Sequence, residues 1–295
     1  MFKKSNNKII KNRSGGKINL REVGIIIFLT IISIGIVMGY LWLFAGSFSG
    51  ELVYGIVPKN FSLKNWRFLW ENPFPENPDW PNIWPILFNT LYLGSGVTLI
   101  VVTVSTLGGY VISRMKFPGR SFLLASTLVL HAFPAITLLI ALYYILKTLN
   151  LLDTITGVVL AKAGFFTPFG IWVMKGFFDG ISWDMEMSAL IDGATRFQAW
   201  HKVMLPIVKP GIAAISIFSF LMGWSEYIFV ITFNRSYSSW TLTSYISAIV
   251  SDYRFSDYGL LAAVSLFYMI PVILFFIFTQ KYLMEITLGG IKGGR

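Results

Sequence analysis

The polar interval that divides this chain is residues 184–211, which read Asp-Met-Glu-Met-Ser-Ala-Leu-Ile-Asp-Gly-Ala-Thr-Arg-Phe-Gln-Ala-Trp-His-Lys-Val-Met-Leu-Pro-Ile-Val-Lys-Pro-Gly. It is the most polar long interval between Arg120 and Arg235, and apolar segments of membrane-spanning length lie on both sides of it. Its pattern predicts two short helices joined by a bend at a membrane surface.

The first helix has a start signal and a stop signal. Ser182 can cap it, and Asp184 and Glu186 place carboxylates in its first turn, where the positive end of the helix dipole favours them. Gly193 is the predicted stop, because glycine tolerates the left-handed conformation that ends many helices.

A second helix is predicted to start two residues later, because Thr195 and Gln198 have the Thr-x-x-Gln spacing of a capping box. We expect Pro206 and Pro210 to end it. Its apolar face, at i, i+3 and i+7, is predicted to consist of Phe197, Trp200 and Met204. A bent helix pair with an exposed apolar face favours the docking of a partner protein.

The composition is that of a membrane protein. Of the 295 residues, 55% are hydrophobic and 13% are charged, whereas globular domains are about 25% charged. The net charge of +10 does not indicate nucleic acid, because the basic residues flank apolar spans. The absence of Cys excludes thiolate metal sites and disulfides, and two His are too few for a histidine metal cluster, so no metal site is predicted. The sequence has no P-loop motif.

Six apolar segments approach or exceed the roughly 20 residues that cross a bilayer core, so we expect an all-α integral membrane protein with its transmembrane domain over residues 23–280. The expected spans are residues 23–45, 85–112, 121–146, 154–178, 211–233 and 258–280. Lys and Arg favour one side of these spans by nearly three to one. This bias places a basic tail (1–22), the loop at 179–210 and a second tail (281–295) in the cytoplasm. Residues 46–84, rich in Pro and Trp, form the predicted external loop.

Two charged residues fall inside predicted spans. Lys162 lies near mid-bilayer, where it must face the protein interior or a wet cavity. It either contacts a polar solute in a pathway or bonds a carbonyl or carboxylate of a neighbouring helix. Glu226, with Trp224 and Tyr227 beside it, suits a sugar-like ligand and suits an ordinary helix interface equally well. His131, ahead of Pro134 in the third span, is interpreted as a core histidine rather than a ligand.

Residues 186–210 closely resemble the cytoplasmic EAA loop of ABC-transporter permease subunits, in which Glu-Ala-Ala precedes a Gly and, further on, Ile-x-Leu-Pro. The residues in register are Ala189, Asp192, Gly193, Ala194, Leu205 and Pro206. The chain is similar to the carbohydrate-uptake branch, the maltose-type permeases, from about residue 23 to its end. Residues 191–195, 205–211, 224–227 and 287–293 carry that resemblance.

The resemblance implies the type I ABC-importer permease fold, with six spans and both termini cytoplasmic. It implies a transport subunit, not an enzyme, that moves a sugar (mono- to oligosaccharide) or a related polyol across the cytoplasmic membrane of a prokaryote. No cofactor is expected in this chain, because ATP and Mg bind the partner ATPase. The implied partners are a second, related permease subunit, two ATPase subunits, an extracytoplasmic solute-binding protein and the lipid bilayer, without nucleic acid.

The resemblance also implies site residues. Coupling to the ATPase is expected at Glu186, Met187, Ser188, Ala189, Asp192, Gly193, Phe197, Trp200, Leu205 and Pro206. Contact of the carboxy terminus with the ATPase is expected at Gly289, Gly290, Lys292 and Gly293. The candidate translocation path consists of Lys162, Trp224, Glu226 and Tyr227.

One position departs from the family pattern. With Gly193 in register, the glutamate of Glu-Ala-Ala falls on Met187 and the first alanine on Ser188. In the family that glutamate commonly pairs with a basic residue of the ATPase. Either this salt bridge is lost and Met187 packs in the groove of the ATPase, or the neighbouring Glu186 reaches across instead.

Two other classes of protein account for less of the sequence. A channel or secondary transporter would explain six spans and Lys162, but not a bent helix pair with an apolar face in the cytoplasm. A membrane-embedded enzyme would need a catalytic constellation, and few acids, two separated His and no Cys do not supply one.

Overall fold

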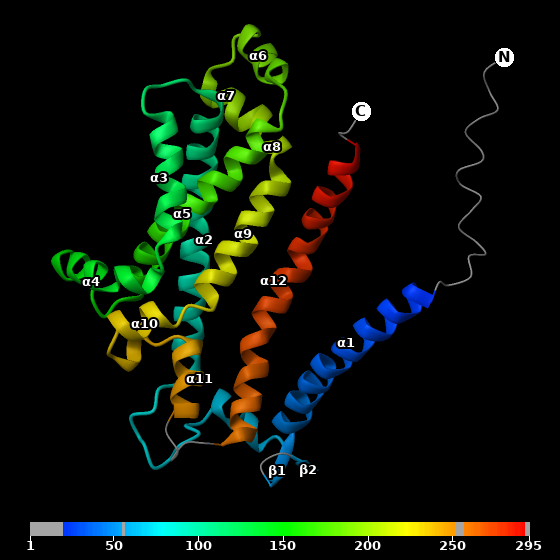
Figure 1. The fold of residues 1–295 in the computed structure, drawn as a ribbon. Coiled ribbons are helices and arrows are strands. Elements are labelled where there is room, and N and C mark those ends of the chain that lie inside the picture. The colour runs from blue at the N-terminus through cyan, green and yellow to red at the C-terminus, as the bar shows by residue number, and fades with distance from the viewer. Residues whose placement is uncertain (1–19, 55–56, 252–256, 293–295) are drawn as a thin grey trace.

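The computed structural model describes residues 20–54, 57–251 and 257–292 as a mainly helical protein (Figure 1). Its α-helices are α1 (Leu20–Ser47), α2 (Ile83–Arg114), α3 (Arg120–Ala132), α4 (Leu139–Thr148), α5 (Ile155–Asp179), α6 (Trp183–Ile191), α7 (Arg196–Ala199), α8 (Leu205–Ile207), α9 (Lys209–Trp224), α10 (Ile228–Phe233), α11 (Leu242–Ser251) and α12 (Tyr258–Lys292). Strands β1 (Ser49–Val53) and β2 (Val57–Phe61) pair antiparallel, with Glu51 opposite Lys59. Three 3-10 turns, η1 (Lys64–Leu69), η2 (Ala135–Leu138) and η4 (Tyr237–Ser239), and one π turn, η3 (Trp200–Met204), complete the described elements.

Helix α2 is the centre of the bundle, because both α5 and α9 pack along it. The approach of α5 requires glycine at position 109. A Cβ atom there would lie 2.8 Å from the Met174 Cβ and 2.9 Å from the Lys175 backbone nitrogen, closer than any side chain tolerates. This contact brings the last turn of α2 against the last turn of α5, below the bent helix pair.

The core of the bundle has two parts. One lies between α2, α5, α9 and α10 and includes Leu93, Val158, Met174, Ile215 and Phe229, each almost fully buried. The other lies toward the β-hairpin, where the loop before α2 meets α11 and the first turns of α12. Its members include Phe68, Ile83, Trp224, Tyr245 and Val264.

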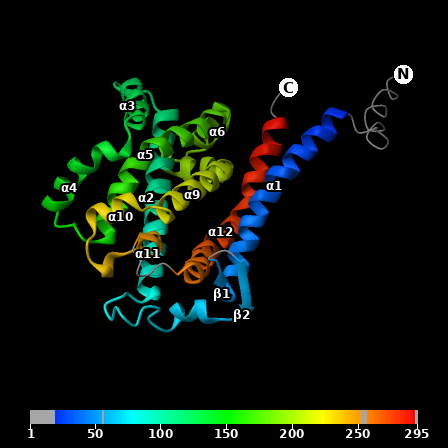
Figure 2. The ribbon, with the colours of Figure 1, turned by 60° about the horizontal axis from the view of Figure 1, so that its bottom comes forward.

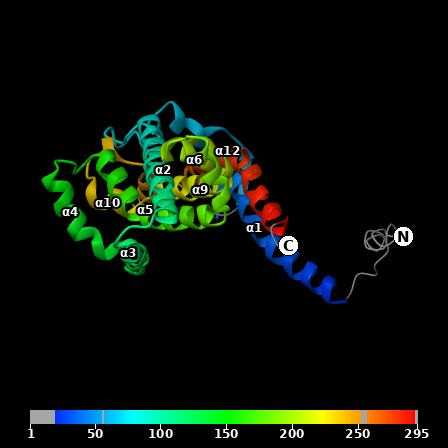
Figure 3. The same cartoon turned by 90° about the horizontal axis from the view of Figure 1, so that it is seen from above.

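Helix α1 stands apart from the bundle, and in the view from above it extends away from the other helices (Figure 3). It packs against α12 and the β-hairpin, and the spanning segment within it, Val23–Ser47, leaves its apolar side chains exposed along most of its length. Such a surface suits contact with lipid or with another membrane helix.

Figure 2 shows which elements share an end of the molecule. The first turn of α1, the last turn of α12 and α6 lie toward one end, and the β-hairpin lies at the other. Helix α12 has 35 residues, about 52 Å at 1.5 Å per residue, which exceeds a hydrocarbon core of about 30 Å. The segment predicted as a tail at 281–295 therefore continues α12 as far as Lys292.

Four described helices are long and apolar enough to cross a membrane, and they match four of the six predicted spans: Val23–Ser47, Ile83–Arg114, Ile155–Asp179 and Tyr258–Gln280. A fifth crossing depends on Arg196–Ile207 and Lys209–Trp224, which meet at 78°. The predicted third span, 121–146, is not one helix. It breaks at Phe133 and Pro134, because a residue before proline is driven out of the helical conformation, and Phe133 adopts ψ 130°.

The predicted external loop, 46–84, is ordered by its own contacts. The Asn65 side chain is buried and donates to the carbonyls of Gly46, Ser47 and Ser49 at 2.9–3.3 Å, which ties η1 to the end of α1. Trp80 is buried against Tyr245 of α11, whereas Trp70 is exposed. The tryptophans of this loop therefore divide between the core and the surface.

Candidate functional site

The segment from α6 to α8, residues 183–207, is called the coupling segment below. Its first helix has the predicted ends. The Ser182 hydroxyl accepts from the Asp184 N–H at 3.2 Å, and Gly193 adopts φ +88° after the last turn. The Gly193 and Ala194 N–H groups donate to the carbonyls of Leu190 and Ala189 at 3.1 and 3.0 Å, the two bonds of a Schellman motif.

The second helix starts as predicted and ends later. Thr195 and Gln198 form both hydrogen bonds of the capping box. The prediction that Pro206 ends this helix is wrong: the helical path continues through the π turn η3 into α8 and breaks at Val208, where the chain bends into α9. In this π turn the Leu205 N–H, one residue before Pro206, donates to the Trp200 carbonyl five residues back. Pro210 stands in the first turn of α9.

The exposed apolar surface of the coupling segment differs from the predicted face. Phe197 is 66% exposed and Trp200 is half-buried, but Met204 is fully buried in the core of the bundle and cannot contact a partner. Ile191, at the last turn of α6, is 83% exposed, and Met185 is exposed as well. Sequence reasoning missed both, although large apolar side chains within a polar interval were the available signal.

Of the other predicted coupling residues, Ser188, Asp192, Gly193 and Pro206 are exposed, and Met187, Ala189 and Leu205 are half-buried. Gly289, Gly290 and Lys292 lie in the last turns of α12, and Gly293 lies outside the described residues.

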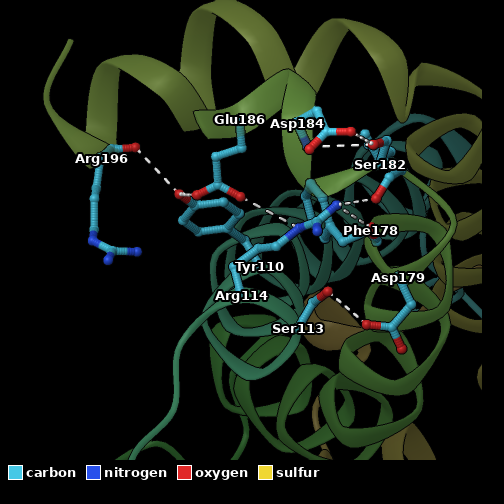
Figure 4. Close-up of polar contacts among 10 residues, drawn as sticks. Tyr110, Ser113, Arg114, Phe178, Asp179, Ser182, Asp184, Glu186 and Arg196 are labelled. Carbon is cyan, nitrogen blue, oxygen red and sulfur yellow. Dashed lines mark hydrogen bonds and ion pairs between the residues drawn. The ribbon is translucent and has the colours of Figure 1, made fainter. Parts of the chain in front are cut away.

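Glu186 faces into the protein (Figure 4). Its side chain is fully buried, and its Oε1 accepts from the Tyr110 hydroxyl at 2.6 Å. Its Oε2 lies 3.4 Å from the Arg114 Nε, close enough for an ion pair but not aligned as a hydrogen bond. The hypothesis that Glu186 reaches across to an ATPase is therefore wrong, because its carboxylate is held within the chain. Half-buried Met187 stays available for the other alternative.

Arg114, the last residue of α2, carries the positive charge that Glu186 needs. Its Nη2 donates to the carbonyls of Phe178 and Ile181, both at 2.7 Å, and its guanidinium lies 5.0 Å from the ring centre of Trp183. A cation at the carboxy-terminal end of α5 also complements the dipole of that helix. Sequence reasoning counted Arg114 only as a topology signal and missed both Arg114 and Tyr110.

A second polar cluster lies within the membrane region of the bundle. Lys162 of α5 forms an ion pair with Glu226, which stands in the break between α9 and α10, and both side chains are largely buried. The Lys162 Nζ also lies 5.3 Å from the ring centre of Phe229. Of the two alternatives for Lys162, the structure has the bond to a carboxylate of a neighbouring element.

Glu226 has further roles in the break. Its Oε1 accepts from the Phe229 N–H in the first turn of α10 at 2.8 Å, and its backbone carbonyl accepts from the Thr243 hydroxyl at 2.7 Å. Trp224 is buried at the end of α9, and its Nε1 has no hydrogen-bond partner among the described residues.

A recess of about 390 Å³ lies next to this cluster between α10 and α11. It is lined in part by Tyr227, Asn234, Trp240, Ser244 and Ser247, a mixture of rings, hydroxyls and an amide. The Asn234 side chain is buried at the wall of this recess, and its amide nitrogen donates to the Ser239 carbonyl at 3.2 Å. Aromatic faces with adjacent hydroxyls and amides are suited to a polar ring such as a sugar.

The remaining sequence candidates do not add to these two clusters. His131 lies in α3, and its side chain is outside the described ones. Among the residues that the structure describes, no three His, Asp or Glu side chains gather as ligands for a metal ion.

Residues 105–284, more than half of the chain, match the family described as binding-protein-dependent transport system inner membrane component. The chain belongs to this family. The match covers the coupling segment, both polar clusters and most of α12, so the resemblance to ABC-transporter permeases is confirmed and the permease is a transport component rather than an enzyme.

Curated relatives of the permease include several named for sugars. It is 30% identical to the maltose/maltodextrin transport system permease protein MalG of Salmonella typhimurium over 93% of this chain and 95% of the relative. It is 28% identical to the trehalose transport system permease protein SugB of Mycobacterium tuberculosis over 88% of this chain and 95% of the relative. The relatives belong to the carbohydrate-uptake branch.

Solved structures share the fold of the permease. A chain of a bacterial ABC transporter involved in the import of the acidic polysaccharide alginate superposes with a TM-score of 0.73 at 23% identity, covering 89% of this chain and 96% of the other. A chain of the MetNI methionine ABC transporter superposes with a TM-score of 0.52 at 18% identity over 69% of this chain and 93% of the other.

Proposed function

We propose that the permease is one of two related transmembrane subunits of an ATP-driven importer that carries a sugar or polyol into the cytoplasm. Two ATPase subunits act on the cytoplasmic side, and an extracytoplasmic binding protein delivers the solute. The observation that carries this proposal is the coupling segment, whose bent helices display Ile191 and Phe197 outside the bundle while its other face is fixed to α2 and α5.

The proposed topology has six crossings, with both termini and the coupling segment in the cytoplasm. Helices α3 and α4 together make the third crossing, and α9 with α10 makes the fifth. The shared end of α1, α6 and α12 in Figure 2 supports this orientation, as does the excess of Lys and Arg in the sequence segments predicted to be cytoplasmic.

In this proposal the ATPase subunits bind the exposed face of the coupling segment. When ATP binds, the two ATPase subunits close together and displace α6 to α8. The bundle responds because the ATP-bound and ATP-free states of the ATPase hold the coupling segment in different positions. Ile191 and Phe197 are the apolar anchors, and Met187 contributes through its exposed part. The carboxy-terminal residues Gly289, Gly290, Lys292 and Gly293 contact the same partner.

The proposed path for the solute passes the break between α9 and α10. The recess lined by Tyr227, Asn234 and Trp240 receives a sugar ring by stacking and hydrogen bonding, and Lys162 and Glu226 lie beside it as polar groups deeper in the bundle. The names of the relatives support a sugar as the solute class.

The test is uptake by vesicles that contain the complete transporter, with trehalose and maltose as labelled solutes and ATP inside or omitted. The proposal predicts uptake that requires ATP, the ATPase and the binding protein. Uptake without ATP would instead indicate a channel or secondary transporter. Trp240→Ala, which changes the recess, should lower sugar uptake. The matched control Tyr54→Ala, at an exposed position outside the recess, should leave uptake unchanged.

A further inference from the structure

The last turn of α2 contacts each of the helices that meet at the coupling segment. Tyr110 and Arg114 stand one turn apart, and their side chains point the same way (Figure 4). Tyr110 donates to Glu186 of α6 at 2.6 Å, and its hydroxyl also lies 3.5 Å from the Arg196 carbonyl at the start of α7. Arg114 binds the end of α5 through two carbonyls and contacts the first residue of α6.

The backbone linker between α5 and α6 constrains the position of α6 less than these side-chain contacts do. Only residues 180–182 join α5 to α6, and Gly180 is one of them. If the side-chain network were absent, a displacement of α6 would change the dihedral angles of this linker before it moved α2 or α5. With the network present, α6 cannot move away from α2 without separating a buried carboxylate from its only buried cation in the described chain.

That separation is unfavourable for a definite reason. Arg114 and Glu186 are 3% and 0% exposed, so water cannot replace either partner. A buried charge that loses its partner keeps its full desolvation penalty, which makes the broken pair much worse than the intact pair. The free-energy cost of separating Arg114 from Glu186 is therefore larger than the net contribution of the intact pair to folding stability.

We propose that Tyr110, Arg114 and Glu186 are positioning residues that join α6 to the adjoining ends of α2 and α5 as one rigid unit, so that displacement of the coupling segment moves these membrane helices directly. This inference rests on the proposed coupling function, and it assigns Glu186 an intrachain role in transmitting motion in place of contact with the ATPase. The close α2–α5 packing at Gly109 extends the unit along both helices.

The test compares sugar moved per ATP hydrolysed in the complete transporter. Glu186→Gln keeps the size of the side chain but leaves Arg114 without a carboxylate, and Tyr110→Phe removes one hydrogen bond while keeping the ring against Phe178. The matched control is Lys175→Gln, which removes the partly exposed Lys175–Asp179 pair at the same end of α5.

We expect Glu186→Gln to lower sugar moved per ATP by about fivefold or more, within the usual range of coupling between sites, while the ATPase subunits still copurify and hydrolyse ATP. Tyr110→Phe should lower the ratio less, and Lys175→Gln should leave it unchanged. A purely structural role would lower transport and ATP hydrolysis together through poor assembly, without changing their ratio.

Hydrogen exchange gives the second measurement. Amides of residues 183–199 should exchange faster in Glu186→Gln than in the wild type, with the amides of α9 unchanged. If Glu186→Gln moved as much sugar per ATP as the wild type and its amides exchanged at the wild-type rate, the proposal would be overturned. Exchange is independent of transport, so failure of ATP-dependent uptake in the wild type would refute the proposed function and leave this comparison intact.

If Glu186→Gln fails to assemble, the double variant Arg114→Met/Glu186→Met replaces it, because it removes both charges and leaves none unpaired. The proposal predicts that this variant assembles and hydrolyses ATP but moves less sugar per ATP. Wild-type coupling in the double variant would show that apolar packing is sufficient and would overturn the assigned role of the pair.

Discussion

Gly193 is the residue at which the coupling segment turns, and its backbone rather than its surroundings requires glycine. Its φ is +88°, and a Cβ atom there would meet nothing within 4 Å. Gly193→Val should therefore strain the Schellman turn by about 1–2 kcal/mol or more, because a β-branched residue tolerates this conformation poorly. We expect lost sugar uptake with normal membrane insertion.

The matched control for Gly193 is Gly176→Ala in α5, where a Cβ also meets nothing within 4 Å and the backbone is helical. It should transport normally. Gly193→Asn should retain part of the activity, since Asn visits the left-handed region more readily than Val. Wild-type uptake by Gly193→Val would contradict the role assigned to this turn.

The buried pair of Lys162 and Glu226 is the second site at which a single substitution should have a large effect, here on folding stability. Lys162→Met leaves the carboxylate of Glu226 buried and unpaired, and breaking such a pair typically destabilises a protein by about 3–5 kcal/mol. We expect a lower thermal unfolding temperature in detergent for each single variant. The double variant Lys162→Met/Glu226→Gln should recover most of the loss, and additive losses would argue against direct pairing.

At the scale of elements, the sequence predicted helix ends correctly where the signal lies in neighbouring residues. The Ser182 cap, the capping box and the Gly193 stop each depend on residues within a few positions, and all three are confirmed. The π turn before Pro206 has no local signal in the sequence, and it ends at Met204, which packs in the bundle core. The pairing of Glu186 with Tyr110 joins residues 76 positions apart, and only the packing of α2 on α5 brings them together.

The turn between α4 and α5 is tied to the segment after α10 by Asp153. Its Oδ1 accepts from the Arg235 and Ser236 N–H groups at 2.9 and 3.0 Å, and its carboxylate also accepts from the hydroxyls of Ser236 and Ser239. Partial burial opposes ionisation, but these hydrogen bonds prevail and lower the pKa of Asp153 to about 2.

A lowered pKa gives Asp153 a defined pH dependence. The contribution of the ionised carboxylate to stability is complete above the ordinary pKa of about 3.9 and is lost as the pH falls through about 2. We expect proteolysis at residues 234–239 to stay slow from pH 7 to about pH 4 in the wild type. Asp153→Asn should be cleaved faster at pH 7, and equal rates would contradict the tie.

At the scale of the whole molecule, the proposed topology can be tested on a chain that has no Cys of its own. Single substitutions Tyr54→Cys, at the hairpin end, and Ile191→Cys, in the coupling segment, place thiols at exposed positions. In intact cells a membrane-impermeant maleimide should label Tyr54→Cys and should label Ile191→Cys only after permeabilisation. The reverse pattern would invert the orientation.

Composition and hydropathy predicted the class of the whole molecule and four of its spanning helices, because burial in lipid leaves a long apolar run. They failed for the third span, where Pro134 divides an apolar run whose hydropathy is continuous. The sequence predicted in part that Lys162 pairs with a carboxylate, because charged residues inside spans usually pair with each other. That the partner is Glu226 depends on how α5 packs against α10.

The Lys162–Glu226 pair has a consequence for how this membrane protein is made. Ribosomes deliver α5 to the insertion machinery before the segment that carries Glu226 has been synthesised, so Lys162 arrives without its counter-charge. An isolated lysine at mid-span opposes release into lipid by about 2.5–3.5 kcal/mol. Helix α5 is therefore expected to stay beside the translocon, or against α2, until some 64 further residues have emerged, which makes the order of synthesis part of how this bundle acquires its shape.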